Sequence, residues 1–168
     1  MDAILSDTRT TSIFVPEQSS TANHDLGCGV SLQWWDNGQI AVFDVPPPIH
    51  AAVDIYIDTL TAIIESWSPD KPLLVATISL SEGSAVTPYL RSRLDDMLYS
   101  PAAERITARF AVIIRKGLFN RIARIFLQLQ VMKGSPAHLP TNLYFDMEEA
   151  FNWLREALES PAEIQDSI

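Results

Sequence analysis

The residues of this sequence that could bind a charged ligand are mainly cations, and they are unevenly distributed. The chain has 168 residues and a formal net charge of -9, yet the stretch 105–133 contains no Asp or Glu. Seven of the 12 lysines and arginines lie in it, namely Arg105, Arg109, Arg115, Lys116, Arg121, Arg124 and Lys133. This stretch is therefore the best candidate for contact with an anion or with an acidic partner.

Four of these cations are candidate binding residues. Arg115 and Lys116 follow an apolar run of strand length, and open α/β sheets commonly bind ligands where their strands end. Arg121 and Arg124 fall on one side of an expected helix, opposite its apolar residues. The alternative is an ordinary exposed face that pairs with acidic residues from elsewhere in the chain.

Two hydroxyls form a second candidate site, in the Ser-Glu-Gly-Ser segment at 81–84. This segment precedes an expected helix in which Thr87 is the N-cap and Pro88 the first residue, a position that favours proline. Helix N-termini attract anions, so Ser81 and Ser84 are candidates for phosphorylation or for binding an anion or partner. A turn and cap is the alternative, and we favour it over a catalytic serine.

The sequence lacks the usual motifs for metal binding and catalysis. His24, His50 and His138 stand singly, and Cys28 is the sole cysteine, so we expect no zinc site and no intrachain disulfide. There is no G-x-S-x-G motif and no glycine-rich nucleotide loop. We therefore expect no metal, no cofactor and no catalytic residue, and a protein that is not an enzyme.

Three carboxylates and two tryptophans allow more than one interpretation. Asp54, Asp58 and Glu65 lie on one side of an expected helix with no opposing carboxylate, which predicts a solvated face. Trp34 and Trp35 are adjacent in an expected strand, so their rings point to opposite faces of the sheet. Either helices cover both rings, or one of them lines a surface groove or a dimer contact.

The composition limits the class of protein. An acidic chain argues against nucleic-acid binding, which requires a cationic surface. No apolar run approaches the ~18 residues of a membrane-spanning helix, and the N-terminus lacks the pattern of a secretory signal. We therefore expect a soluble, cytoplasmic protein without integral membrane association.

The hydrophobic pattern predicts one α/β domain at 29–158, between a flexible N-terminal arm at 1–28 and an acidic tail at 159–168. Strands are expected at 30–35, 39–45, 73–80, 106–114 and 142–145, and helices at 49–67, from 88, at 118–132 and from 146 to about 158. The Asp-Asn-Gly turn at 36–38 predicts a tight hairpin, and Asp146 with Glu149 predicts a capping box. The order β-β-α-β-α-β-α-β-α predicts a mixed, mainly parallel central sheet with flanking helices.

Several segments resemble the SpoIIAA-like proteins, which are grouped with STAS-type anti-sigma-factor antagonists and Sec14-type (CRAL-TRIO) modules. They are the strand with Trp34-Trp35, the helix end Glu65-Ser66-Trp67, the strand Ala111–Ile114, the segment 121–126 and the F-D-x-E-E-A-x-x-W-L pattern at 145–154. The resemblance spans about residues 30–158 and implies a STAS-like fold and a bacterial protein. It also places the regulatory serine of such antagonists at 81–84, where this sequence lacks the family's Asp-Ser pair.

The element order and the missing catalytic motifs lead us to expect a non-enzymatic interaction or regulatory module. It would form a homodimer or bind another protein, through the loop at 81–84 and the neighbouring helices. The alternative is a carrier of a small molecule or lipid, of the Sec14 type. Such a carrier would need an apolar pocket, which we would place near Trp34, Trp35 and the helix expected at 118–132.

Overall fold

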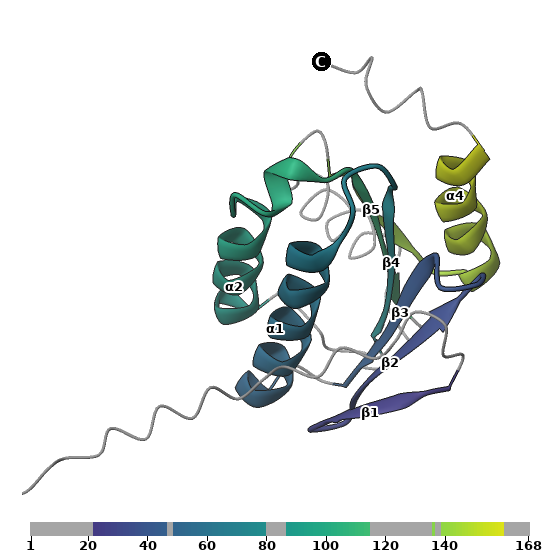
Figure 1. Ribbon diagram of the computed structural model, residues 1–168. Coiled ribbons are helices and arrows are strands. Elements are labelled where there is room, and N and C mark those ends of the chain that lie inside the picture. The colour runs from purple at the N-terminus through teal and green to yellow at the C-terminus, as the bar shows by residue number, and fades with distance from the viewer. Residues whose placement is uncertain (1–21, 47–48, 80–86, 115–135, 137–138, 160–168) are drawn as a thin grey trace, which may run out of the picture.

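The computed structural model describes residues 22–46, 49–79, 87–114, 136 and 139–159. Over these ranges a six-stranded sheet lies between two layers of helix (Figure 1). The strands are β1 (His24–Gly27), β2 (Val30–Trp35), β3 (Ile40–Val45), β4 (Leu73–Ser79), β5 (Ala108–Ile114) and β6 (Thr141–Tyr144). The helices are α1 (His50–Ser66), α2 (Pro88–Leu98) and α4 (Met147–Glu159), with a short 3-10 helix, η1, at Ala103–Arg105. None of these helices has the length and apolar character that a membrane span requires.

The strands follow one another across the sheet in chain order. The pairs β1–β2 and β2–β3 are antiparallel, whereas β3–β4, β4–β5 and β5–β6 are parallel. The prediction of a mixed sheet with mainly parallel central strands is therefore confirmed. The connections from β3 to β4 and from β4 to β5 carry α1 and α2, which lie on the same side of the sheet, as crossovers of one hand require. Helix α4 covers the other side (Figure 1).

The sheet buries an apolar core on each face. On one face, side chains such as Phe43 and Val75 pack beneath α1, whose buried residues are Ala52, Val53, Tyr56, Ile57, Thr59, Leu60, Ile63 and Ile64. On the other face, Val42 and Ala76 belong to a core that includes Phe151 and Leu154 of α4. Because both faces are covered, the central strands read as nearly continuous apolar runs.

The ordered domain begins earlier than the sequence predicted. We expected residues 1–28 to form a flexible arm, but His24–Gly27 form β1, which pairs with β2. The prediction was wrong for these residues because a four-residue edge strand is too short to show an alternating pattern. The β1–β2 turn depends on glycine, since Gly27, Cys28 and Gly29 all have positive φ angles (103°, 51° and 80°). The far boundary also differs, because Glu159 is the last residue of α4 and not part of the tail.

The hairpin between β2 and β3 is confirmed. Asp36, Asn37 and Gly38 have φ angles of 51°, 59° and 81°, and the backbone N–H of Gln39 donates to the carbonyl of Trp35 at 3.1 Å. Asn and Gly tolerate these left-handed conformations better than other residues do, so they fix the register in which Trp35 pairs with Ile40.

Two predicted helix starts are confirmed by their caps. The Thr87 hydroxyl accepts a hydrogen bond from the Leu90 N–H at 3.1 Å, and Pro88 is the first residue of α2. Asp146 Oδ1 accepts from the N–H groups of Glu148 and Glu149 at 2.8 and 3.2 Å. The other predicted elements that the structure describes agree with their expected bounds to within two residues, whereas η1 was not predicted. The helix expected at 118–132 lies outside the described residues.

Candidate functional site

Most candidate residues chosen from the sequence fall outside the described residues. They are Ser81, Ser84, Arg115, Lys116, Arg121 and Arg124. The elements beside them are described, because β4 ends at Ser79, α2 begins at Pro88 and β5 ends at Ile114. The two candidate tryptophans are described as well.

Trp34 is a core residue on the α1 side of the sheet. Its side chain is 1% exposed, and its ring stacks on Trp67 with the centroids 6.0 Å apart. The indole N–H of Trp67 donates to the Lys71 carbonyl at 2.9 Å, which ties the end of α1 to the start of β4. Because the Trp34 ring is enclosed by its own chain, it is not available at a surface contact.

Trp35 lies on the opposite face, as its position next to Trp34 predicted. It is half-buried and stacks on Phe151 of α4, with ring centroids 4.7 Å apart and planes inclined by 13°. The neighbouring turn is fixed to the same helix, since Arg155 Nε lies 2.6 Å from Asp36 Oδ2. The main role of Trp35 in the described structure is therefore to pack the hairpin against α4.

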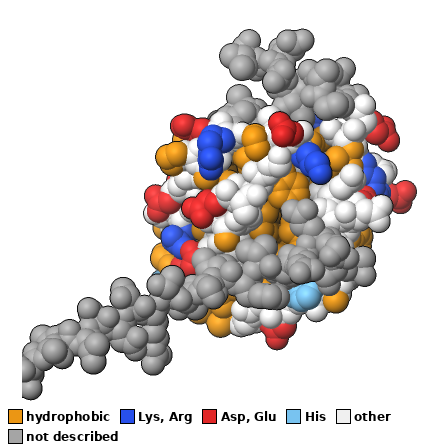
Figure 2. Space-filling view, viewed as in Figure 1, with side chains coloured by type: hydrophobic (Ala, Val, Ile, Leu, Met, Phe, Trp, Pro, Cys, Tyr) orange, Lys and Arg blue, Asp and Glu red, His pale blue; other side chains and the backbone are white. Residues whose placement is uncertain are grey.

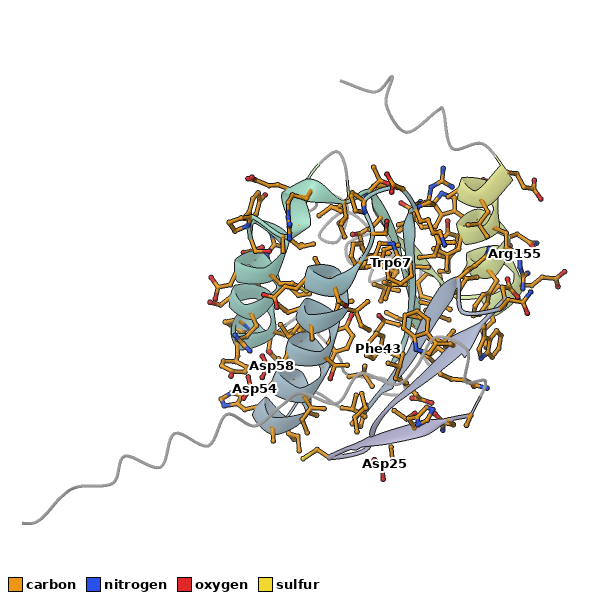
Figure 3. All side chains as sticks on the ribbon, in the orientation of Figure 1. Asp25, Phe43, Asp54, Asp58, Trp67 and Arg155 are labelled. Atoms are coloured by element: carbon orange, nitrogen blue, oxygen red, sulfur yellow. The ribbon has the colours of Figure 1, made fainter. Side chains whose placement is uncertain are left out.

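A group of polar side chains joins α1 to α2, and we call it the α1–α2 polar cluster. It consists of His50, Asp54 and Asp58 on α1 and of Tyr89 and Arg93 on α2. The Tyr89 hydroxyl donates to Asp54 Oδ1 at 2.5 Å, and Arg93 reaches Asp54 Oδ1 through Nε at 3.2 Å and Asp58 Oδ1 through Nη2 at 2.5 Å. The His50 ring stacks on the Tyr89 ring with the centroids 4.1 Å apart. Both carboxylates project from α1 toward α2 (Figure 3).

In this cluster one guanidinium, that of Arg93, is shared by the two carboxylates of Asp54 and Asp58. The hydrogen bond to Asp54 raises the pKa of the Tyr89 hydroxyl above its usual value. Burial lowers the pKa of Arg93, but the charge and hydrogen bond of Asp58 and the charge of Asp54 outweigh burial, so this pKa is raised. Both shifts favour the forms that these two groups have near pH 7, the neutral phenol and the charged guanidinium. The cluster therefore acts as a polar bridge between α1 and α2.

Sequence reasoning missed this cluster. The predicted solvated face agrees with the exposure of Asp54, Asp58 and Glu65, since the side chains of the first two are 40% and 48% exposed. The prediction did not include the contacts that Asp54 and Asp58 make with two residues 35 positions later. A usable signal exists, since Tyr89 and Arg93 are also four residues apart and share one side of their helix. The pairing of Asp54 and Asp58 with residues of α2 can be predicted once α1 and α2 are known to be neighbouring crossover helices.

An apolar residue is exposed beside the cluster. Ile49 precedes α1, its side chain is 59% exposed, and it adjoins His50, which stacks on Tyr89. Because β3 and β4 lead into α1 and α2, this end of both helices lies at the carboxyl ends of the parallel strands, where open α/β sheets commonly bind ligands. We call Ile49, His50, Pro88 and Tyr89 the helix-end surface.

Of the seven cations in the stretch 105–133, the structure describes Arg105 and Arg109. Arg109 Nη1 donates to the Trp153 carbonyl at 2.8 Å, and its guanidinium carbon lies 5.1 Å from the centre of the Trp153 ring. It therefore fastens α4 to β5. On the face shown in Figure 2, cationic and acidic side chains are interspersed and form no single-sign patch. The part of the chain that the structure describes contains no group of three His, Cys, Asp or Glu residues that could hold a metal ion.

Comparisons with protein-family models, with curated proteins and with solved structures found no match for this chain.

Proposed function

We propose that this protein is a non-enzymatic interaction module that docks another protein at the helix-end surface. The segment 81–84 belongs to the same proposal because it leads directly into α2. The order of the elements and the mixed, mainly parallel sheet support the proposal, since they resemble STAS-type antagonists, which act by binding proteins. The polar cluster supports it too, because its charged groups are engaged with one another.

The observation that carries the proposal is the residue at the start of α1. Ile49 is the N-cap of this helix, with φ −82° and ψ 149°, and it makes no capping hydrogen bond. Ser, Thr, Asp and Asn are strongly preferred at an N-cap, and isoleucine is among the least favourable residues. The start of α1 thus lacks a side-chain cap, and Ile49, an apolar residue, is 59% exposed. Contact with a partner explains both costs, because residues that break a stability rule are commonly retained for function.

The substitution Ile49→Asp should change folding stability and partner binding in opposite directions. Aspartate can cap α1, so we expect the free energy of unfolding to rise by about 1 kcal/mol. The same change removes an apolar contact and adds charge at the interface, so binding should weaken at least roughly tenfold. The two measurements are denaturant unfolding of the purified protein and affinity capture from the cells that produce it, with quantification of the captured proteins.

Tyr99→Asp is the matched control, because Tyr99 is 64% exposed at the other end of α2. A protein captured by the wild type and by Tyr99→Asp, but lost with Ile49→Asp, is the expected result. Capture of the same proteins by both variants would contradict the proposal. A stoichiometric apolar small molecule in native mass spectra of the purified wild type would instead favour the carrier alternative.

A further inference from the structure

Helix α2 is held to the rest of the described fold differently at its two ends. Met97 and Leu98 in its last turn are 3% and 8% exposed and belong to the core on the α1 side of the sheet. Tyr89, Leu90 and Leu94 in its first two turns are only partly buried against this core. The last turn is therefore the end that hydrophobic burial anchors.

The first two turns of α2 also contain its two members of the α1–α2 polar cluster. One of them, Arg93, contacts Asp54 and Asp58 of α1, and these three side chains are between 30% and 48% exposed. Ion pairs with this exposure contribute little to stability and are weakened by salt. The attachment of these turns to α1 is therefore weaker than that of the last turn, and it depends more on ionic strength.

Helix α2 is also too short to persist without α1. It has 11 residues, and isolated helices shorter than about 12–15 residues are only marginally stable in water. Among the described elements, α2 packs mainly against α1, which lies beside it in Figure 1, and against η1. Turns of α2 that separate from α1 should therefore unwind.

We propose that the first two turns of α2, residues 88–95, separate from α1 and unwind as one unit, and that the α1–α2 polar cluster holds them in the closed state. The last turn stays in place because Met97 and Leu98 remain buried, and the same core continues through Ala103 and Ile106. Openings of this kind occur at free energies below that of global unfolding.

This opening would change the surface of the domain. It would expose Leu90 and Leu94, and it would separate Tyr89 from His50, whose ring stacks on it. The helix-end surface would thereby be taken apart, so a partner bound there would favour the closed state by mass action. That consequence rests on the proposed function, whereas the opening itself is a property of the free protein.

Amide hydrogen exchange of the free, full-length protein, followed by NMR, tests the opening. Arg93→Gln breaks the ion pairs between the helices, and Arg91→Gln is the matched control because Arg91 pairs with Asp95 inside α2. Exchange at the amides of 91–95 should accelerate roughly tenfold in Arg93→Gln and by no more than about twofold in Arg91→Gln. Added salt should accelerate the same amides in the wild type, and less so in Arg93→Gln.

A third variant distinguishes this opening from global unfolding. Leu98→Val weakens the packing of the last turn, which the opening leaves intact. It should accelerate the slowest amides of α1 several-fold and leave the rates at 91–95 unchanged, because those amides exchange without release of the last turn.

In the wild type, the amides of 91–95 should share one protection factor and exchange at least roughly tenfold faster than the slowest amides of α1. Equal rates in these two groups would show that α2 opens only when the whole domain unfolds, and a gradual change of rate along 91–95 would show ordinary fraying. Either result, or equal effects of the two arginine variants, would overturn the proposal.

Discussion

At Ile49, the side chain present is not the one that would stabilise the fold best. Ile49 leaves the start of α1 without a side-chain cap. Neighbouring positions follow the expected rules, since Thr87 caps α2 and Asp36 is paired with Arg155. This contrast is informative, because replacing a residue that is retained for function often increases the stability of the fold.

Tyr56, by contrast, is a side chain whose contacts stabilise the fold, and it gives a prediction for how the free energy of unfolding depends on pH. Its hydroxyl is 2.9 Å from Thr77 Oγ1 inside the core, and its ring meets Phe43 edge to face at 5.1 Å. Burial raises the pKa of the Tyr56 hydroxyl, and the hydrogen bond to Thr77 lowers it by less. The folded state therefore favours the protonated hydroxyl. This contribution is fully present below the unfolded pKa of about 10 and is lost as pH rises through the folded pKa.

We expect the free energy of unfolding to decline above about pH 10, by up to about 1.4 kcal/mol per pH unit for each such tyrosine. Tyr56→Phe should make this decline shallower while lowering stability near pH 7 by about 1 kcal/mol, since the hydrogen bond to Thr77 is lost. Chemical denaturation of both proteins between pH 7 and 11 provides the measurement. Identical slopes above pH 10 would mean that Tyr56 ionises as readily in the folded protein as in the unfolded chain.

At the scale of elements, the hydrophobic period and the turn and cap residues were sufficient to place most of the described fold. The apolar stripe of α1, the Asn-Gly turn and the proline at the start of α2 each act within a few residues, so a single sequence reveals them. Strand β1 was missed because pairing with β2, and not a pattern of its own, creates it. The α1–α2 polar cluster was missed for a related reason, since its partners are 35 residues apart.

The start of α4 provides a direct test of one such local signal. Asp146→Ala removes the acceptor for the N–H groups of Glu148 and Glu149, so the free energy of unfolding should fall by about 1 kcal/mol. Glu148→Ala is a suitable control, because Glu148 is exposed and is bonded to the cap through its backbone. The readout is urea denaturation of the three proteins. Equal losses in the two variants would indicate that the effect comes from charge at the helix N-terminus and not from the cap.

At the scale of the whole molecule, the sheet order brings together residues that the sequence leaves apart. The parallel pairing of β3 and β4 places the beginnings of α1 and α2, with Ile49 and Tyr89, at one end of the domain, and the segment 81–84 precedes α2 in the chain. The sequence indicated this segment from its serines and from the cap that follows, but it did not indicate Ile49. An exposed isoleucine is recognised as unusual after the helix boundary and its empty cap are known.

Hydrogen–deuterium exchange of the wild type, with and without its captured partner, tests docking at the helix-end surface most directly. Our account predicts that the partner slows exchange in peptides covering the first turns of α1 and α2, while α4 is unaffected. Tyr99→Asp should show the same protection, and Ile49→Asp should lose it. Protection confined to α4, or protection at α1 and α2 that persists in Ile49→Asp, would contradict docking at this surface.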